Sequence, residues 1–573
     1  MQRGGRKGRR RERKVGDERM GGGGERRSGP TLSAFLEELA QRHGDRPAIL
    51  WGDAAIGYAA LLDESRRVAQ GLTELGVGRG DRVAIWMPNA PAWLALHFAC
   101  ARLGAILVAV NTRFRSAEVG DIVGRSGAKA LALWPGFKGI DFLGILDGID
   151  PAALDRLETL VFYDGGGSGG GAASTPASLP GGKRAVAYTD HAARPPLTAD
   201  LARGPDDGSN IFTTSGTTKA PKFVLDDHFS VVGHARLVAR GFGYDAPGSV
   251  TLLALPLCGV FGFAQAMASL AAGCPMAMQA SFDAEEAARL IRRHGVTTFN
   301  ATDDMAARLL NAAPAGAGGT MTPFPSLAWI GFAGFNPTLA ELPEQAEARG
   351  VRLVGLYGAS EVQALYARQP VDAKLPARGR AGGYPIAPAA AARVRDPSSG
   401  RLLPPGESGE LELKGPSVMA GYYGDEAATT AAFAEDGFVR TGDLAHMLPD
   451  GIGFVFEGRM GDVLRLGGYL VAPSEIEAYV QQHEAIDGCQ VVGVPGESGL
   501  VAIGFVTLRP GAGTFDEAAL RDHCARGLAR FKVPAAFLRL DEFPTTTSAN
   551  GTKIQRAKLR EMAAAWAARG AGR

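Results

Sequence analysis

A polar loop at residues 213–224 combines the residue types that bind polyphosphates. It reads Thr-Thr-Ser-Gly-Thr-Thr-Lys-Ala-Pro-Lys-Phe-Val, with hydroxyls, a glycine and two lysines close together. The glycine permits a positive φ, so that backbone N–H groups can turn toward one anion, while the hydroxyls and lysines add donors and charge. The loop is not a Walker A motif, because no G-x-x-x-x-G-K-[ST] occurs in the chain. Taken alone, it is equally compatible with an anion cradle and with an ordinary polar surface loop.

Further segments place carboxylates and lysines at wide intervals after this loop. They read YGASE at 357–361, GESGELELKGPSVMAGYY at 406–423, RTGD at 440–443, GRMGD at 458–462 and NGTKIQR at 550–556. In this order, they resemble the core motifs of the adenylate-forming superfamily, which includes acyl-CoA synthetases, amino-acid adenylation domains and firefly-type luciferases. The resemblance covers roughly residues 31–562 and is strongest for the branch of AMP-forming acyl-CoA synthetases and acid–CoA ligases.

The resemblance implies a two-step ligation with ATP, Mg²⁺ and CoA. A carboxylate attacks the α-phosphate of ATP and releases pyrophosphate, and a thiol then attacks the acyl-adenylate and releases AMP. The first step requires charge neutralisation and in-line positioning of two anions.

The same resemblance implies roles for individual residues of the ATP site. The loop donors would hold the β- and γ-phosphates, Asp443 would accept the ribose hydroxyls, and Tyr357 would stack on adenine. Glu361 would hold Mg²⁺, because a hard cation prefers carboxylate oxygen. The complete implied set is Ser215, Gly216, Thr217, Thr218, Lys222, Gly334, Tyr357, Ser360, Asp443 and Arg459 for ATP and AMP, with Glu361, Thr218 and Lys553 as the catalytic residues.

The C-terminal region supplies a lysine, a hinge and a thiol channel in this interpretation. Lys553 would bridge the substrate carboxylate and the α-phosphate, although Lys558 is a competing candidate because Gly551-Thr552-Lys553 departs from the usual Thr-Gly-Lys. Asp462 matches the family hinge, about which the small domain would rotate between the two steps. Gly467, Gly468 and Tyr469 would then line the CoA channel.

Three positions depart from the family pattern. Lys219 and Phe223 replace glycines of the phosphate loop, and Gly461 replaces a common lysine before the hinge. The departures remove no essential donor, but the loss of glycine restricts φ and is expected to alter loop mobility.

The acyl side is assigned to residues that follow the phosphate loop and a Leu-Pro-Leu segment. The implied pocket residues are His228, Cys258, Gly259 and Phe261, with a structural role as the alternative for His228. No charged residue occurs from 251 to 282, and burial of an ammonium group without a partner would be costly. An apolar acid, whether fatty, alicyclic or aromatic, is therefore favoured over an amino acid.

The elements that must position these residues predict an α/β fold. A helix from Thr31, a β-α-β unit over 82–110 (strand 82–87, helix 91–103, strand 105–110), and strands at 252–257, 296–300, 327–332 and 353–356 indicate largely parallel sheets. A smaller α+β pattern follows, with helices at 474–483 and 516–529 and strands at 490–494 and 502–508. The expected division is a disordered basic tail over 1–30, an AMP-binding domain over 31–462 with a flexible glycine-rich insertion over 164–184, and a small mobile domain over 463–565.

Composition sets limits on the function classes. The chain has 573 residues, a formal net charge of +1 and five scattered cysteines, which predicts no disulfide framework, no zinc site and no nucleic-acid partner. The scattered cysteines favour a reducing, cytoplasmic environment, and no apolar run reaches the roughly 18–20 residues of a membrane span. A homodimer is left open as the oligomeric state. The alternatives are an enzyme that loads a carrier protein or stops at the adenylate, and a non-catalytic protein that binds nucleotides or, through its basic arm, nucleic acid.

Overall fold

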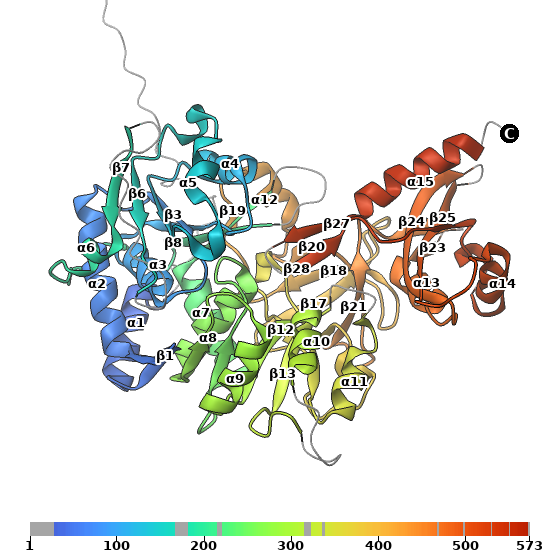
Figure 1. The fold of residues 1–573 in the computed structure, drawn as a ribbon, viewed down its shortest axis with the longest axis horizontal. Helices are drawn as coiled ribbons and strands as arrows, with labels where there is room; N and C mark the ends of the chain where they lie inside the picture. Colours follow the sequence, from blue (N-terminus) through green and yellow to red (C-terminus); the bar gives the residue numbers. More distant parts are fainter. Residues whose placement is uncertain are drawn as a thin grey trace, which may run out of the picture.

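The protein was analysed as a computed structural model that describes residues 28–166, 182–214, 221–313, 322–334, 339–466, 469–496, 499–528, 530–548 and 551–570. Within these ranges, the side chains of 465, 469–470, 496, 499, 546–548, 551–553 and 570 are also not described. The expected basic tail and most of the glycine-rich insertion therefore lie outside the described residues. Figure 1 shows a large α/β body followed by a smaller C-terminal unit at one end of the molecule.

An eight-stranded sheet forms one half of the large body, in the order β19-β9-β8-β4-β3-β5-β6-β7. Its strands from β8 to β7 run parallel, and β9 and β19 close one edge in antiparallel fashion. The strands are β3 (Arg82–Trp86), β4 (Ile106–Ala109), β5 (Ala130–Leu133), β6 (Thr159–Phe162), β7 (Arg184–Ala187), β8 (Gly208–Thr213), β9 (Phe223–Asp227) and β19 (Gly421–Tyr422).

A thirteen-stranded sheet forms the other half, in the order β17-β18-β20-β21-β16-β15-β14-β13-β12-β10-β11-β1-β2. Its segment from β14 to β1 is parallel, whereas the strands beyond β14 pair antiparallel. The strands are β1 (Pro47–Trp51), β2 (Ala54–Gly57), β10 (Thr251–Leu253), β11 (Met276–Met278), β12 (Thr298–Thr302), β13 (Trp329–Ala333), β14 (Leu353–Tyr357), β15 (Ala367–Arg368), β16 (Gly382–Pro385), β17 (Ala391–Arg395), β18 (Gly409–Lys414), β20 (Val439–Met447) and β21 (Phe454–Arg459).

The two sheets share one hydrophobic core with the helices that pack against them. Residues of both sheets and of helices α1, α2, α3, α7 and α8 belong to this core, while α4 and α5 cover the other face of the eight-stranded sheet. The helices are α1 (Leu32–His43), α2 (Tyr58–Glu74), α3 (Pro91–Leu103), α4 (Ser116–Ser126), α5 (Phe142–Asp147), α6 (Tyr188–Ala192), α7 (His228–Gly241), α8 (Val260–Ala272), α9 (Ala284–His294), α10 (Asp303–Ala312), α11 (Leu342–Ala348) and α12 (Glu426–Ala432).

The described strands after residue 462 join neither large sheet. They form a two-stranded ladder, a three-stranded sheet and a second two-stranded ladder. The elements are β22 (Leu464–Leu466), β23 (Tyr469–Val471), β24 (Ile486–Gly496), β25 (Gly499–Leu508), β26 (Ala536–Arg539), β27 (Thr545–Ser548), β28 (Gly551–Ile554), α13 (Pro473–Val480), α14 (Glu517–Gly527) and α15 (Arg556–Gly570).

The structure confirms most of the expected helices and strands. The largest difference is the length of the strand expected over 252–257. Helix α3 has the predicted bounds, because a proline occupies its first turn and Gly104 ends it in the left-handed region at φ 63°. The strand expected over 252–257 is wrong in length, since β10 ends at Leu253. The Asn89 amide accepts from the Leu257 N–H at 2.7 Å and donates to the Leu255 carbonyl at 3.0 Å, which removes this segment from the ladder.

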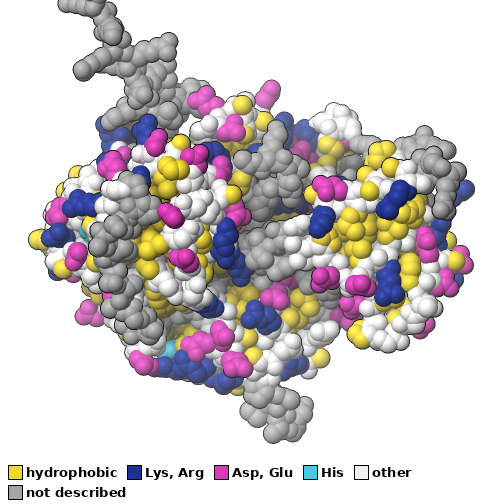
Figure 2. Space-filling view, turned by 45° about the horizontal axis from the view of Figure 1, so that its top comes forward, with side chains coloured by type: hydrophobic (Ala, Val, Ile, Leu, Met, Phe, Trp, Pro, Cys, Tyr) yellow, Lys and Arg dark blue, Asp and Glu magenta, His cyan; other side chains and the backbone are white. Residues whose placement is uncertain are grey.

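On the face drawn in Figure 2, the described basic and acidic side chains are interspersed and form no field of one sign. Among the described residues, no helix is both long and apolar enough to span a membrane.

Candidate active site

The candidate site lies at the carboxyl ends of neighbouring parallel strands. Strand β13 pairs in parallel with β14, so Gly334, which follows β13, lies at the same edge of the sheet as Tyr357 at the end of β14. Ser360 and Glu361 follow Tyr357 in a 3₁₀ turn over Ser360–Val362. Four predicted residues are therefore brought to one edge by two short connections.

Asp443 forms the centre of a buried polar group on the antiparallel side of this edge. Its Oδ2 accepts a hydrogen bond from the Tyr357 hydroxyl at 2.6 Å. The register of β20 and β21 places Asp443 opposite Arg459, whose Nη1 lies 2.9 Å from Oδ1 as an ion pair. The orientation of this pair is not that of a hydrogen bond, so Oδ1 remains a buried acceptor without a hydrogen-bond donor. The arrangement could accept a ligand hydroxyl.

Burial governs the protonation of this carboxyl group. Asp443 is only 2% exposed, and desolvation raises its pKa to about 6, against the opposing effects of the Arg459 charge and the Tyr357 hydrogen bond. The Tyr357 ring packs edge-on against Phe454 at 5.1 Å and tilted against Phe456 at 5.7 Å. The Tyr357 side chain is thus held at its hydroxyl by Asp443 and at its ring by Phe454 and Phe456. Its stacking on adenine stays a prediction.

Glu361 and Lys222 both contact Tyr422. The Tyr422 hydroxyl donates to Glu361 Oε1 at 2.8 Å, and the Lys222 ammonium lies 4.5 Å from the centroid of the Tyr422 ring. The backbone of Lys222 closes the base of the phosphate loop, since the Thr214 N–H donates to the Lys222 carbonyl at 3.0 Å. A carboxylate and an ammonium group are thereby placed beside one tyrosine.

A strained turn follows Glu361. Gln363, Ala364 and Leu365 have φ values of 59°, 52° and 44°, a conformation that costs about 1 kcal/mol or more for each non-glycine residue. The buried His234 supports the turn, because its Nε2 donates to the Ala364 carbonyl at 2.9 Å. A Cβ on Gly358 would lie 2.5 Å from the Ala364 Cα, so the motif glycine is required for this close approach.

The predicted acyl residues divide into two places. Cys258, Gly259 and Phe261 lie together at the start of α8, where Asn89 holds the preceding segment. Burial raises the pKa of the Cys258 thiol to about 12, and nearby Arg113 acts in the opposite direction.

His228 lies at the first position of α7, fully buried. Its Nδ1 accepts from the Leu32 N–H at 2.9 Å, which agrees with the structural alternative, while its Nε2 has no described partner. Burial lowers its pKa to about 4 and that of neighbouring His97 to about 3, so both rings are neutral.

The remaining predicted residues lie partly outside the described structure. Ser215, Gly216, Thr217, Thr218 and Lys219 of the loop, together with Gly467 and Gly468, are not described, and neither are the side chains of Tyr469 and Lys553. Lys553 has a described backbone on β28, opposite Thr546 of β27.

Asp462, the predicted hinge, contacts the last helix of the chain. Its carboxylate pairs with Arg560 and lies 4.0 Å from Arg556 Nε, both on α15. Arg556 also donates to Glu477 at 2.7 and 2.9 Å, so the network reaches α13.

Comparisons with known proteins identify the family of this chain. The family described as "AMP-binding enzyme" matches residues 36–423, and the family described as "AMP-binding enzyme C-terminal domain" matches residues 475–550. The chain belongs to the AMP-binding enzyme family. This enzyme is an acid–thiol ligase of the acyl-CoA synthetase and acid–CoA ligase class.

Several relatives align with nearly the full length of this chain. The sulfoacetate–CoA ligase of Cupriavidus necator is 31% identical over 92% of this chain and 97% of its own, and the 2-succinylbenzoate–CoA ligase of Geobacillus kaustophilus is 30% identical over 93% and 98%. Among solved structures, ATP-bound MatB from Rhodopseudomonas palustris has a TM-score of 0.77 at 25% identity and covers 93% of this chain and 99% of its own.

Sequence reasoning missed Tyr422 and His234 of this AMP-binding enzyme as parts of the site. Tyr422 stands within the quoted GYY segment, but nothing in the sequence indicates that its hydroxyl reaches Glu361, 61 residues away. The left-handed turn at residues 363–365 could not be predicted from the sequence either, because Gln, Ala and Leu rarely adopt left-handed backbone conformations.

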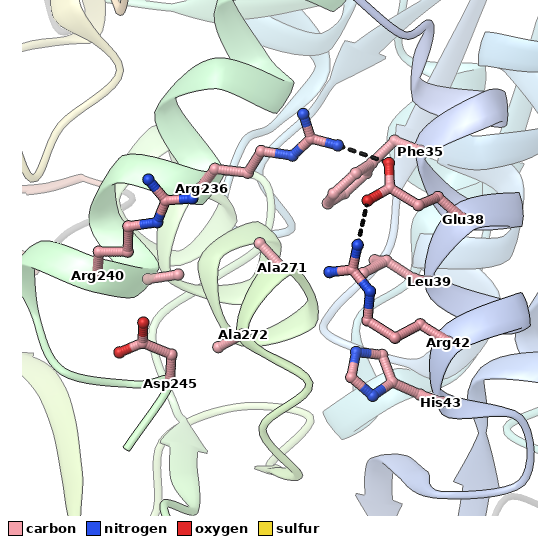
Figure 3. A pocket seen from close by; sticks show the side chains of 11 residues that line it. Phe35, Glu38, Leu39, Arg42, His43, Arg236, Arg240, Asp245, Ala271 and Ala272 are labelled. Atoms are coloured by element: carbon pink, nitrogen blue, oxygen red, sulfur yellow. Dashed lines mark hydrogen bonds and ion pairs between the residues drawn. The ribbon is translucent and has the colours of Figure 1, made fainter. Parts of the chain in front are cut away.

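A cavity of about 610 Å³ lies elsewhere in the AMP-binding enzyme, at the C-terminal ends of α1, α7 and α8 (Figure 3). Arg42 and Arg236 both pair with Glu38 at 2.7 Å on its wall. None of its lining residues belongs to the predicted site, and the basic side chains there complement the negative ends of the helix dipoles.

Proposed function

We propose that this enzyme activates an apolar carboxylic acid as acyl-AMP and transfers the acyl group to CoA, with release of pyrophosphate and AMP. The observation that carries the proposal is the buried Asp443 carboxylate at the same strand edge as Glu361, with Oδ1 ion-paired to Arg459 and not hydrogen-bonded within the described residues. A carboxylate accepts two hydroxyl donors, as the ribose of ATP presents.

The chain's own residues would bind and orient ATP. Asp443 accepts from the ribose, Arg459 faces the same carboxylate, and Lys222 supplies positive charge to the phosphates, together with Ser215, Thr217 and Thr218 of the loop. The substrate carboxylate forms a bond to the α-phosphorus as the bond to the pyrophosphate oxygen breaks. Lys553 would offset the repulsion between these two anions during that step.

Glu361 fits a Mg²⁺ ion that shares its coordination with nucleotide phosphates. Within the described residues, no group of three or more His, Cys, Asp or Glu side chains could hold a metal ion. The described side chains therefore do not supply a complete set of metal ligands. Mg²⁺ commonly uses one or two carboxylates together with phosphate oxygens, and Glu361 supplies one such carboxylate. Bound there, the ion would neutralise charge on the leaving pyrophosphate.

The acid is proposed to be apolar because residues 251–282, which include Cys258, Gly259 and Phe261, contain no charged side chain. Acceptance of CoA rests on the predicted channel residues Gly467, Gly468 and Tyr469, and a carrier protein is the alternative acceptor.

An acid panel tests the proposal directly. The enzyme is supplied with Mg²⁺, ATP and single acids, including medium-chain, alicyclic, aromatic and dianionic acids, with and without CoA. We expect AMP release that CoA accelerates and an acyl-CoA product by mass, with an apolar acid preferred by about tenfold or more in kcat/KM. Lys553→Ala is the control and should suppress adenylate formation. AMP release without acceleration by CoA would overturn the ligase assignment, and preference for a dianionic acid would overturn the apolar one.

A further inference from the structure

Tyr422 lies between two oppositely charged side chains that the ATP site requires. It is 8% exposed, its hydroxyl donates to Glu361 Oε1 at 2.8 Å, and its ring faces the Lys222 ammonium at 4.5 Å. The three residues come from β19, from the turn after β14 and from the base of the phosphate loop. One side chain therefore binds an anion with its hydroxyl and a cation with its ring.

The position of Tyr422 is fixed by its neighbours on both sides. Strand β19 pairs with β9, which places Tyr422 opposite Val224, two residues after Lys222. The Tyr422 N–H donates to Thr429 Oγ1 at 2.9 Å. The Met419 N–H donates to the Glu361 carbonyl at 2.9 Å, so the chain segment that bears Tyr422 also holds the backbone of Glu361.

Opposite charges that contact the same side chain could otherwise pair with each other. An ammonium and a carboxylate in contact near a protein surface attract by several kcal/mol. Within the part of the chain that the structure describes, Lys222 and Glu361 make no ion pair, although both contact Tyr422. The aromatic ring offers the cation an interaction of about 0.5–2 kcal/mol, which leaves the Glu361 carboxylate without a bound cation and which a phosphate can replace.

We propose that Tyr422 is a positioning residue that keeps Lys222 and Glu361 apart, so that each remains available to Mg·ATP. This inference rests on the proposed function. Without the ring, Lys222 could pair with Glu361, and each binding event would first have to separate two charges. The hydroxyl has a separate effect, because it orients the carboxylate that would hold the metal ion. Tyr422 acts through its two neighbours and takes no part in bond formation.

Two substitutions separate these effects. Tyr422→Phe removes the hydrogen bond to Glu361 but keeps the ring, whereas Tyr422→Leu removes both. We expect Tyr422→Phe to weaken binding of Mg·ATP by about two- to fivefold and Tyr422→Leu by about tenfold or more. Binding of metal-free ATP should change less than binding of Mg·ATP in Tyr422→Phe.

The Kd values are measured by isothermal titration calorimetry of the full-length enzyme with Mg·ATP and with metal-free ATP, in the absence of acid and CoA. Steady-state kinetics on the best acid of the panel should show a raised KM for ATP with a smaller change in kcat. Tyr423→Phe is the matched control, since Tyr423 packs against the hydrophobic core beneath the opposite face of the sheet, with α4 and α5. It should bind Mg·ATP as the unsubstituted enzyme does.

The inference is overturned if Tyr422→Leu binds Mg·ATP as tightly as the unsubstituted enzyme, or if Tyr422 and Tyr423 variants lose affinity equally. Circular dichroism and thermal unfolding of each variant show whether a loss of affinity reflects loss of the fold, and Tyr422→Phe keeps the test valid if Tyr422→Leu does not fold. If the unsubstituted enzyme does not bind Mg·ATP, the proposed function is overturned as well. If it binds Mg·ATP and Tyr422→Leu binds equally well, only the inference about Tyr422 fails.

Discussion

The carboxyl group of Asp443 titrates near the pH at which many enzymes work, because it is almost completely buried. Its pKa is raised from 3.8 to about 6, so it is ionised above pH 6 and protonated below. A protonated carboxyl group has less acceptor capacity for ribose hydroxyls than the carboxylate. ATP binding should therefore weaken as the pH falls through 6, which is the direction expected for a raised pKa that must be ionised for function.

The kcat/KM for ATP should fall about tenfold per pH unit below 6, because it reports the protonation of the free enzyme. Asp443→Asn keeps the size of the side chain and cannot titrate. The kcat/KM of this variant should be low at every pH and should lack the fall near pH 6 that ionisation of Asp443 causes. Titration of ATP itself affects both proteins alike. Parallel pH profiles for the two enzymes would contradict this assignment.

At the scale of elements, helix α4 fixes the base of the phosphate loop. Arg125 near its end pairs with Asp121 at 2.6 Å and donates to the Pro221 carbonyl at 2.8 Å. The same guanidinium group lies 4.0 Å over the ring of Phe223, which is 2% exposed. The phenylalanine that replaces a family glycine thus docks residues 221–223, and with them Lys222, onto α4.

Arg125→Ala should raise the KM for ATP by about five- to tenfold. Besides the pair with Asp121, it removes the hydrogen bond and the cation–π contact that hold residues 221–223, worth roughly 1–1.5 kcal/mol together. The kcat should change little. Arg67→Ala is a matched control, since Arg67 also pairs with an aspartate four residues earlier, Asp63, and donates to a carbonyl, that of Arg194. An unchanged KM in Arg125→Ala, measured by steady-state kinetics, would show that the contact does not position Lys222.

Elements with local signals could be predicted from the sequence, whereas contacts across the site could not. Helix α3 has a proline at its start and a glycine at its end, so both its bounds follow from the sequence. The motif resemblance identified Asp443 and Tyr357 separately, but their 2.6 Å hydrogen bond spans 86 residues. The left-handed turn at Gln363 is held by His234 from α7, and such tertiary support overrides local propensity.

At the scale of the whole molecule, helix α15 contacts the predicted hinge at Asp462 through Arg556 and Arg560. Rotation about Asp462 would have to separate its carboxylate from Arg560 and Arg556 of α15. Arg560 also donates to the Gly461 carbonyl at 2.8 Å, so it holds the backbone of the hinge as well. We expect these contacts to favour the described arrangement of the small C-terminal unit over any arrangement that rotation about Asp462 would produce.

Arg560→Gln should therefore change the two half-reactions unequally, since it lowers the population of one arrangement and raises that of the other. A loss of about 1–2 kcal/mol corresponds to a shift of roughly 5- to 30-fold in that equilibrium. The measurement compares the rate of adenylate formation with the rate of thioester formation from synthetic acyl-AMP and CoA. Arg539→Gln, which removes an exposed pair with Asp541 on the same unit, should leave both rates unchanged. Equal losses in both half-reactions would mean that Arg560 contributes to stability and not to the hinge.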